Sequence, residues 1–335
     1  MKFDSKALLA AAGLTALAFT PAYATEGGDQ ATKPGAFIGA SAGVPPPGIY
    51  MFNQVFTYDA NLVGPGTARL NPPGTKTGVQ AAVDVQGFLF VPGWTFLGAT
   101  YDAVIVQPFV QQSLGSPINV QAAGMFNTYI VPVELSWKLG TSGFAIKTGL
   151  GIYLDDGATT SPATLNGPAN PYYTFQPELI VSYLANGWNL TAAMYDEINT
   201  ENRVTHYTTG NIFHADFTAT KTIGKWTFGP VAYYVGQVTD DSCPVSCTAL
   251  GGSILNHVQR YDEWAVGGLI GYDFGPASVS VWATQEVYAH GRNDAALAAA
   301  GNDPSLMAQG MTVFATLSYR LWAPEEPAKA PMFHK

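Results

Sequence analysis

Apolar and polar residues alternate along most of this chain, in runs of about ten residues between Gly48 and Trp322. Short clusters of Gly, Pro, Asn and Asp separate the runs. The clearest run covers 128–138, where every second residue is apolar: Tyr129, Val131, Val133, Leu135 and Trp137. Because successive side chains of a strand point to opposite faces, such a run predicts a strand with one apolar and one polar face.

The same reasoning extends along the whole chain and predicts twelve strands. We expect them over 48–59, 78–91, 95–107, 122–138, 142–155, 171–186, 187–200, 208–223, 225–239, 259–274, 276–291 and 308–322. From the fourth strand onward, short breaks such as Asn186-Gly187 alternate with long ones. Short periplasmic turns alternating with long outer loops are typical of bacterial outer-membrane barrels. A soluble sandwich would show the alternation in shorter runs. The fold expected is therefore all-β: a transmembrane antiparallel β-barrel of about twelve strands with up-and-down topology, over 48–322.

The amino terminus predicts export. Lys2 and Lys6 precede a short apolar run, and Ala22-Tyr23-Ala24 fits a signal-peptidase site, so residues 1–24 are expected to be a signal peptide. The apolar run is shorter than the ~20 residues that a spanning helix needs. The apolar stretch 88–110 is interrupted by Pro, Gly and Asp. We therefore expect the protein in the bacterial outer membrane, spanning it as strands and contacting lipid.

Composition agrees with a membrane barrel and excludes one class of partner. Charged residues make up 12% of the chain, about half of the ~25% usual in globular proteins. Aromatic residues and 36 glycines are abundant, which suits lipid-facing strands with aromatic girdles. The formal net charge is −9, and removing the signal peptide takes two lysines and one aspartate. Such an acidic surface repels nucleic acid, so no nucleic-acid partner is expected.

Assigning the apolar face of each strand to lipid predicts which side chains face the lumen. Apolar residues expected to face lipid include Val79, Val83, Val85, Leu89, Phe144, Leu150, Phe217, Trp264 and Ile270. The charged residues expected to face the lumen are Asp84, Asp102, Glu134, Lys138, Lys147, Glu178, Glu197, His214, Asp216, Glu263, Glu286 and Arg320. Salt bridges between strands would account for them without catalysis.

The chain carries no motif that predicts an enzyme or a bound cofactor. Neither G-x-S-x-G nor H-E-x-x-H occurs. His214 and Asp216 share a strand face, but no nucleophile accompanies them. Asp240-Asp241, with Asp155-Asp156 and Asp102, could hold a divalent ion at a loop base, or could be solvated turn residues. No catalytic residue, cofactor or metal is therefore assigned.

The two cysteines, Cys243 and Cys247, lie in a predicted outer loop. In an exported protein such a pair is expected to form a disulfide. A metal site is the alternative, although a single C-x3-C pair without histidine is a weak zinc signal.

Segments along the chain resemble one family. The stretch 209–221, continuing through Gly229-Pro230 to 237–241, is similar to the outer-membrane family named for the meta-pathway of phenol degradation. Residues 266–275 and 45–50 resemble two further segments of that family. The resemblance implies an outer-membrane barrel akin to the fatty-acid and toluene channels, passing aromatic or other hydrophobic compounds. The cysteine pair, and a tail over 323–335 on the periplasmic side, depart from the family pattern.

The function expected is passive uptake of small hydrophobic, in particular aromatic, solutes through the lumen. The alternatives are a general or structural porin-like barrel and a lipid-modifying barrel enzyme. Candidate lumen residues for transport are Val231, Tyr233, Val235, Gln237, Thr239, His214, Asp216, Glu134, Lys147 and Arg320. In the ninth predicted strand, Val231, Tyr233 and Val235 would give the lumen an aromatic, apolar lining, or Tyr233 would merely fill a narrow barrel.

The ends of the mature chain carry two further expectations. The segment 25–47 is rich in small residues and is expected either to plug the lumen or to form a disordered tail. The barrel-assembly machinery is an expected partner, and its signal would lie within Gly310–Trp322.

Overall fold

The computed structural model is a β-barrel, and it describes residues 30–159, 168–204, 206–242, 260–292 and 307–324. The predicted signal peptide, the predicted disulfide of Cys243 and Cys247, and most of the tail lie outside these residues. The elements are β1 (Gly48–Val63), α2 (Thr67–Leu70), β2 (Gly78–Val91), β3 (Thr95–Phe96), β4 (Ala99–Leu114), β5 (Val120–Met125), β6 (Tyr129–Lys138), β7 (Phe144–Tyr153), β8 (Thr174–Tyr183), β9 (Trp188–Asn199), β10 (Ile212–Ile223), β11 (Trp226–Gln237), β12 (Arg260–Asp273), β13 (Ala277–Arg292) and β14 (Met307–Trp322). None of the helices in the described part of the chain is long and apolar enough to cross a membrane.

Twelve of these strands close into an antiparallel barrel. Each of β1, β2, β4 and β6 to β14 pairs with its neighbours, and β14 pairs back onto β1. The predicted all-β, twelve-stranded, up-and-down barrel is thereby confirmed. β3 forms a small hairpin with the start of β4. β5 pairs with the last residues of β4, Phe109 to Leu114.

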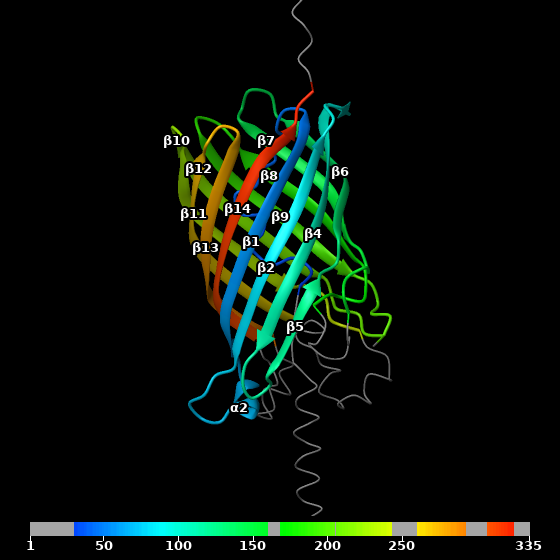
Figure 1. Ribbon diagram of the computed structural model, residues 1–335, viewed down its shortest axis with the longest axis vertical. Helices are drawn as coiled ribbons and strands as arrows, with labels where there is room; N and C mark the ends of the chain where they lie inside the picture. The colour runs from blue at the N-terminus through cyan, green and yellow to red at the C-terminus, as the bar shows by residue number, and fades with distance from the viewer. Residues whose placement is uncertain (1–29, 160–167, 205, 243–259, 293–306, 325–335) are drawn as a thin grey trace, which may run out of the picture.

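The two ends of the barrel differ, as Figure 1 shows. At one end, which we call the short-turn end, strands are joined by tight turns such as Asn186-Gly187. Both residues have positive φ, 53° and 75°, which is the geometry of a type I′ hairpin turn and explains the Asn-Gly sequence. The opposite end, the long-loop end, carries α2 and the long connections.

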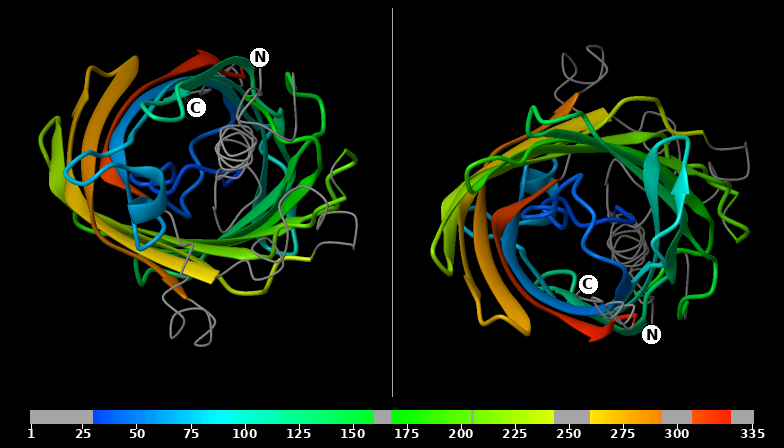
Figure 2. Two further views of the ribbon diagram at one scale, coloured as in Figure 1. Left: turned by 90° about the horizontal axis from the view of Figure 1, so that it is seen from below. Right: turned by 90° about the horizontal axis from the view of Figure 1, so that it is seen from above.

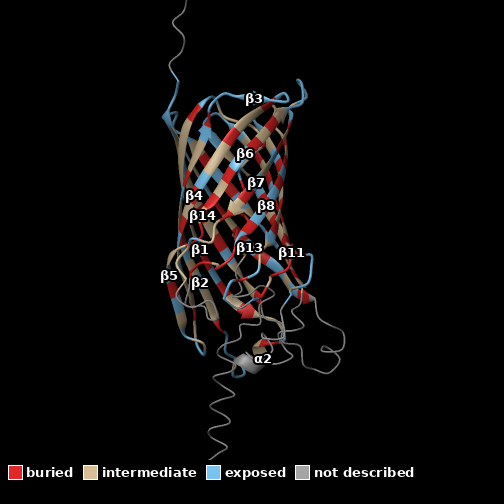
Figure 3. Cartoon of the chain, turned by 90° about the vertical axis from the view of Figure 1, so that its right-hand side faces the viewer, coloured by how far each residue is buried: buried red, intermediate tan, exposed pale blue. Residues whose placement is uncertain are grey.

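Outward side chains give the barrel its membrane face. Exposed apolar residues recur at every second position, for example Leu179, Val266 and Ile270, and Figure 3 shows this alternation of buried and exposed positions. Aromatic pairs ring the short-turn end, with Phe144 and Tyr183 5.1 Å apart between ring centroids. This is the apolar band with an aromatic girdle that a lipid environment favours.

Several predicted strand boundaries need correction. The predicted strand 95–107 begins as β3 and, after a turn at Leu97-Gly98, continues as β4. The predicted strand 122–138 is divided into β5 and β6, and between them the Asn127 side chain donates to the carbonyl of Asn170, 2.8 Å away. β4 continues through Pro108, where a loop was expected. It pairs with β6 up to Val106 and with β5 from Phe109, so the proline lies where the neighbouring strand changes.

The predicted faces of β2 are wrong. Val79, Val83, Val85 and Leu89, which were all expected to face lipid, line the lumen cavity. Asp84 lies on the outside, where its carboxylate accepts a hydrogen bond from the Asn53 side chain at 2.6 Å. Assigning apolar residues to lipid presupposes a water-filled lumen, and beside β2 the lumen is apolar.

A non-strand segment enters the barrel. Residues 30–47, hereafter the lumen segment, run through the interior before β1 begins, and both end-on views in Figure 2 place this segment within the ring of strands. Its two ends reach opposite ends of the barrel. The Ala42 N–H donates to Ser182 at the short-turn end of β8, and the Ala31 N–H donates to Glu197 at the long-loop end of β9.

Candidate functional site

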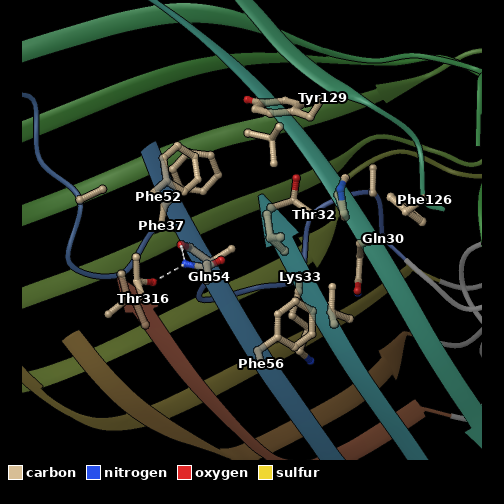
Figure 4. A pocket seen from close by; sticks show the side chains of 18 of the residues that line it. Gln30, Thr32, Lys33, Phe37, Phe52, Gln54, Phe56, Phe126, Tyr129 and Thr316 are labelled. Carbon is tan, nitrogen blue, oxygen red and sulfur yellow. Dashed lines mark hydrogen bonds between the residues drawn. The ribbon is translucent and has the colours of Figure 1, made fainter. Parts of the chain in front are cut away.

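The lumen segment leaves a cavity of about 860 Å³ along one side of the barrel. We call the inward surface of β1, β2 and β4 the apolar wall. It is lined by Phe52, Phe56, Val79, Val83, Val85, Val104, Val106 and Val110. Figure 4 shows Phe52, Phe56 and Tyr129 around the cavity, together with Gln30, Thr32, Lys33 and Phe37 of the lumen segment. Most residues on this side of the cavity are aliphatic or aromatic, and the lumen segment borders the other side.

The opposite wall holds the lumen segment. We call the inward surface of β8, β9 and β10 the polar wall. Glu197 accepts hydrogen bonds from the backbone N–H of Ala31 at 3.0 Å and of Thr32 at 2.7 Å. Asp216 accepts from the N–H of Gly35 at 3.0 Å and of Phe37 at 2.9 Å. Two buried carboxylates therefore bind four backbone donors of a segment that has no strand partner.

Hydroxyl groups continue these contacts toward the short-turn end. The Gly39 N–H donates to Thr218 Oγ1 at 2.9 Å, and the Ala42 N–H donates to Ser182 Oγ at 2.8 Å. The Ser136 hydroxyl donates to the Ala42 carbonyl. Buried backbone groups need such partners, and the polar wall supplies them together with Ser136 of β6 and Gln54 of β1, which donates to the Ala36 carbonyl.

The sequence of the lumen segment explains its path. Gly35 and Gly39 both have φ of +87°, a conformation that residues with a side chain rarely adopt. A Cβ on Gly35 would lie 3.0 Å from Cδ1 of Tyr233, so the segment also requires a glycine to pass close to β11. Trp282 Nε1 donates to the Gly35 carbonyl at 3.1 Å, which fixes this turn from a third strand.

The structure places His214 and Asp216 together beneath the lumen segment. His214 Nε2 lies 3.3 Å from Glu197 Oε1, and its ring stacks on Tyr195 with centroids 4.5 Å apart. Both residues therefore belong to the polar wall that carries the segment.

Val231, Tyr233 and Val235 point inward but do not line the cavity. They are fully or almost fully buried in a cluster with Ile38 of the lumen segment. The Tyr233 hydroxyl donates to Glu286 at 2.6 Å. The segment thus separates these three residues from the open space, which lies on the other side of it.

The remaining transport candidates lie in three separate places. Gln237 and Thr239 are at the long-loop end, where the Gln237 amide donates to Asp241 at 2.7 Å. Glu134 and Lys147 line the cavity, and Lys147 Nζ lies 3.3 Å from Glu134 and 3.2 Å from Asp102. Arg320 is at the short-turn end, 6.0 Å from the ring of Tyr50.

A second ionic cluster was not singled out by the sequence patterns. Lys33 Nζ lies 3.4 Å from Glu286 and 3.6 Å from the centre of the Tyr58 ring. The Tyr58 hydroxyl donates to the same carboxylate at 2.8 Å. Lys33 is the only basic residue of the sequence between Thr25 and Pro47, which is the one signal that could have drawn attention to it.

The aspartates considered for a divalent ion do not converge. Asp240 pairs with Arg260 at 2.8 Å and Asp155 with Arg203 at 2.6 Å, while Asp241 accepts from the Gly210 N–H. Among the described residues, no group of three or more His, Cys, Asp or Glu could hold a metal.

Comparison with known proteins agrees with this architecture. The family model described as "Putative MetA-pathway of phenol degradation" matches residues 55–298, more than half of the chain. No curated protein matches the chain in sequence.

Several solved structures resemble the chain. One is the COG4313 outer membrane channel from Pseudomonas putida F1, with a TM-score of 0.64 and 8% identity over 86% of this chain and 99% of that one. A Pseudomonas aeruginosa FadL homologue has a TM-score of 0.43 and 8% identity over 82% of this chain and 90% of that one. The TodX monoaromatic hydrocarbon channel deltaS2 mutant has a TM-score of 0.41 and 10% identity over 88% of this chain and 93% of that one. At 8% identity, the first likeness shows the fold of a bacterial outer-membrane barrel.

Proposed function

This chain belongs to the family of the phenol-degradation model, and from that premise we propose that it is an outer-membrane channel for passive uptake of small hydrophobic, in particular aromatic, compounds. The cavity beside the apolar wall is the observation that carries the proposal. It is large enough for a small aromatic solute, and valines and phenylalanines make up much of one side of it.

The physical basis is the free energy gained when the apolar surface of a solute leaves water. Apolar surface removed from water gains roughly 25 cal/mol per Å², so a ring that buries about 150 Å² gains about 4 kcal/mol. A wholly polar pore would offer such a solute no equivalent gain. The solute would then move down its concentration gradient, because uptake by partition and diffusion needs no coupled energy source.

The lumen segment would act as the plug of this channel. Between Ala31 and Ala42 it occupies the space beside the polar wall and leaves the apolar wall free. Its displacement would join the cavity to both ends of the barrel. Export by the signal peptide and insertion by the barrel-assembly machinery, through the last strand, complete the proposal.

Transport of an aromatic solute into liposomes tests the proposed function. The full mature chain should admit a labelled neutral aromatic compound faster than a sugar of similar mass. Val83→Asp places a charge in the apolar wall and should slow aromatic uptake at least fivefold. Ala82→Asp, which adds the same charge on the outward face of the same strand, is the matched control and should have little effect.

Conductance separates the channel from the alternatives. Deleting 31–42 should raise single-channel conductance in planar bilayers if the segment is a plug. Equal uptake of the sugar and the aromatic compound would favour a general porin, and no uptake of either would favour a structural barrel.

A further inference from the structure

One carboxylate of the cavity is buried without a hydrogen-bond donor. Glu263, on β12, lines the cavity and is 7% exposed. No described residue donates a hydrogen bond to its carboxylate, whereas Glu286, on the neighbouring strand β13, accepts from both Tyr58 and Tyr233. Buried carboxylates normally have donors, so Glu263 offers an unused acceptor at the cavity surface.

The surroundings of Glu263 form a polar part of the cavity, at a distance from the apolar residues of β2 and β4. Gln30, Lys33 and Tyr261 line the same region, and the Gln30 amide donates to the Tyr261 hydroxyl at 2.5 Å. The Lys33 ammonium is already held between Glu286 and the Tyr58 ring. Among the described residues, a molecule in the cavity would therefore meet a free acceptor, but no free cation, in this region.

The charge balance inside the barrel points the same way. Among the described residues, the buried carboxylates are Asp102, Glu134, Glu178, Glu197, Asp216, Glu263 and Glu286. Two ammonium groups, Lys33 and Lys147, face them, and both are within 3.4 Å of a carboxylate. An anion entering the cavity would lose its hydration and gain no uncommitted counter-charge.

We propose that the cavity selects uncharged apolar molecules that carry one N–H or O–H donor, that Glu263 accepts the hydrogen bond from this donor, and that anionic apolar molecules are rejected. This rests on the proposed function of the cavity and adds the class of solute. Phenolic and arylamine solutes fit the description, and arylcarboxylates and arylsulfonates do not.

Two fluorescent probes with the same body test the charge rule on the purified full-length mature protein. N-phenyl-1-naphthylamine is neutral and carries one N–H, and 8-anilino-1-naphthalenesulfonate adds a sulfonate to the same skeleton. Titrated against a detergent-only blank, the neutral probe should bind at least tenfold more tightly. Equal affinities would overturn the charge rule while leaving the apolar cavity as a binding site, and binding of neither probe would overturn the proposed function as well.

Variants and one further probe test the role of Glu263. Glu263→Gln should reduce the preference for the neutral probe at least threefold, mainly by strengthening binding of the sulfonate. The matched control is Asp59→Asn, which removes an exposed carboxylate on the outward face of β1 and should leave the preference unchanged. An unchanged preference in a Glu263→Gln protein that keeps its heat-modifiable gel mobility would overturn the assignment.

The hydrogen bond can be tested without any variant. N-methyl-N-phenyl-1-naphthylamine lacks the N–H but keeps the aromatic body. It should bind the unaltered protein at least threefold more weakly than the parent amine. Equal or tighter binding of the methylated probe would overturn the donor requirement, whether or not the Glu263 variant folds.

Discussion

The apolar wall and the polar wall of the lumen are built with opposite polarity. On β2 the valines point inward, and Asp84 points outward to Asn53. On β10 the arrangement is reversed, because Asp216 points inward to the lumen segment while Phe217 is exposed on the outside. Both strands alternate apolar and polar residues over part of their length. The contents of the lumen, and not the strand itself, therefore decide which face is apolar.

The two walls also use different forces. The apolar wall borders open space and acts through the area it can remove from water. The polar wall is already occupied, and two of its carboxylates, Glu197 and Asp216, accept hydrogen bonds from backbone donors of the same chain. The apolar wall is thus free to contact a solute, whereas the polar wall binds the lumen segment.

The strongest test of this difference removes both anchoring carboxylates of the polar wall. Glu197→Ala together with Asp216→Ala leaves four backbone N–H groups without charged acceptors, each such hydrogen bond contributing roughly 1.5–3 kcal/mol. We expect the lumen segment to leave its position and single-channel conductance to rise more than fivefold. Asp196→Ala, next to Glu197 but bonded to Asn211, is the control. Conductance equal to the unaltered protein would mean that the polar wall does not hold the segment.

A charge in the apolar wall should have the next largest effect. Val83→Asp should weaken binding of a neutral aromatic probe about tenfold, since fully burying a valine-sized group contributes roughly 1.5–3 kcal/mol. Fluorescence titration measures the affinity, with Ala82→Asp as the outward control. Equal losses in both variants would mean that the probe binds the outer surface of the barrel.

Tyr233, on β11, tests whether residues covered by the lumen segment contribute to solute binding. Because Tyr233 is covered by the lumen segment and bonded to Glu286, Tyr233→Phe should change probe affinity less than twofold. Combined with deletion of 31–42, the same substitution should change affinity more, because the segment no longer covers the ring. A large effect of the single variant would place Tyr233 on the solute path of the intact protein.

The smallest expected effect concerns the loop beyond β11. Burial raises the pKa of Asp241 to about 6, against hydrogen bonds from Gly210, Tyr207 and Gln237 that lower it. Because folding raises this pKa, the protonated carboxyl of Asp241 stabilises the folded structure around it. This contribution to the local free energy of unfolding is present near pH 4 and is lost as pH rises through 6.

Hydrogen exchange can detect this pH dependence. After correction for intrinsic rates, amides over 207–210 should exchange two- to fivefold faster at pH 7 than at pH 5, and Asp241→Asn should remove the difference. Exchange that slows toward pH 7 in the unaltered protein would contradict the sign.

Sequence alone located the strands because the two-residue period depends only on backbone geometry. It could not orient β2, because alternation is unchanged when the two faces are exchanged. The sequence pattern ends a strand before Pro108, whereas β4 continues through it. A proline fits in β4 because β5 replaces β6 as the neighbouring strand at this point, and the sequence of β4 alone does not show that change. The cavity was missed for the same reason as the face of β2, since its valines were assigned to lipid. The alternation in the ninth predicted strand places Tyr233 on the inward face. It does not show that residues near the amino terminus cover this side chain, because that contact is not encoded in the strand.

The three prolines that join the lumen segment to β1 have a kinetic consequence. Pro45, Pro46 and Pro47 lie between the last anchored residue, Ala42, and the first residue of β1, Gly48, and consecutive prolines form a stiff, extended tether. A segment on so short a tether meets its own binding site at a high effective concentration, on the order of millimolar or above. Release would therefore be brief and self-reversing, and a free peptide of the same sequence would compete only at comparable concentrations.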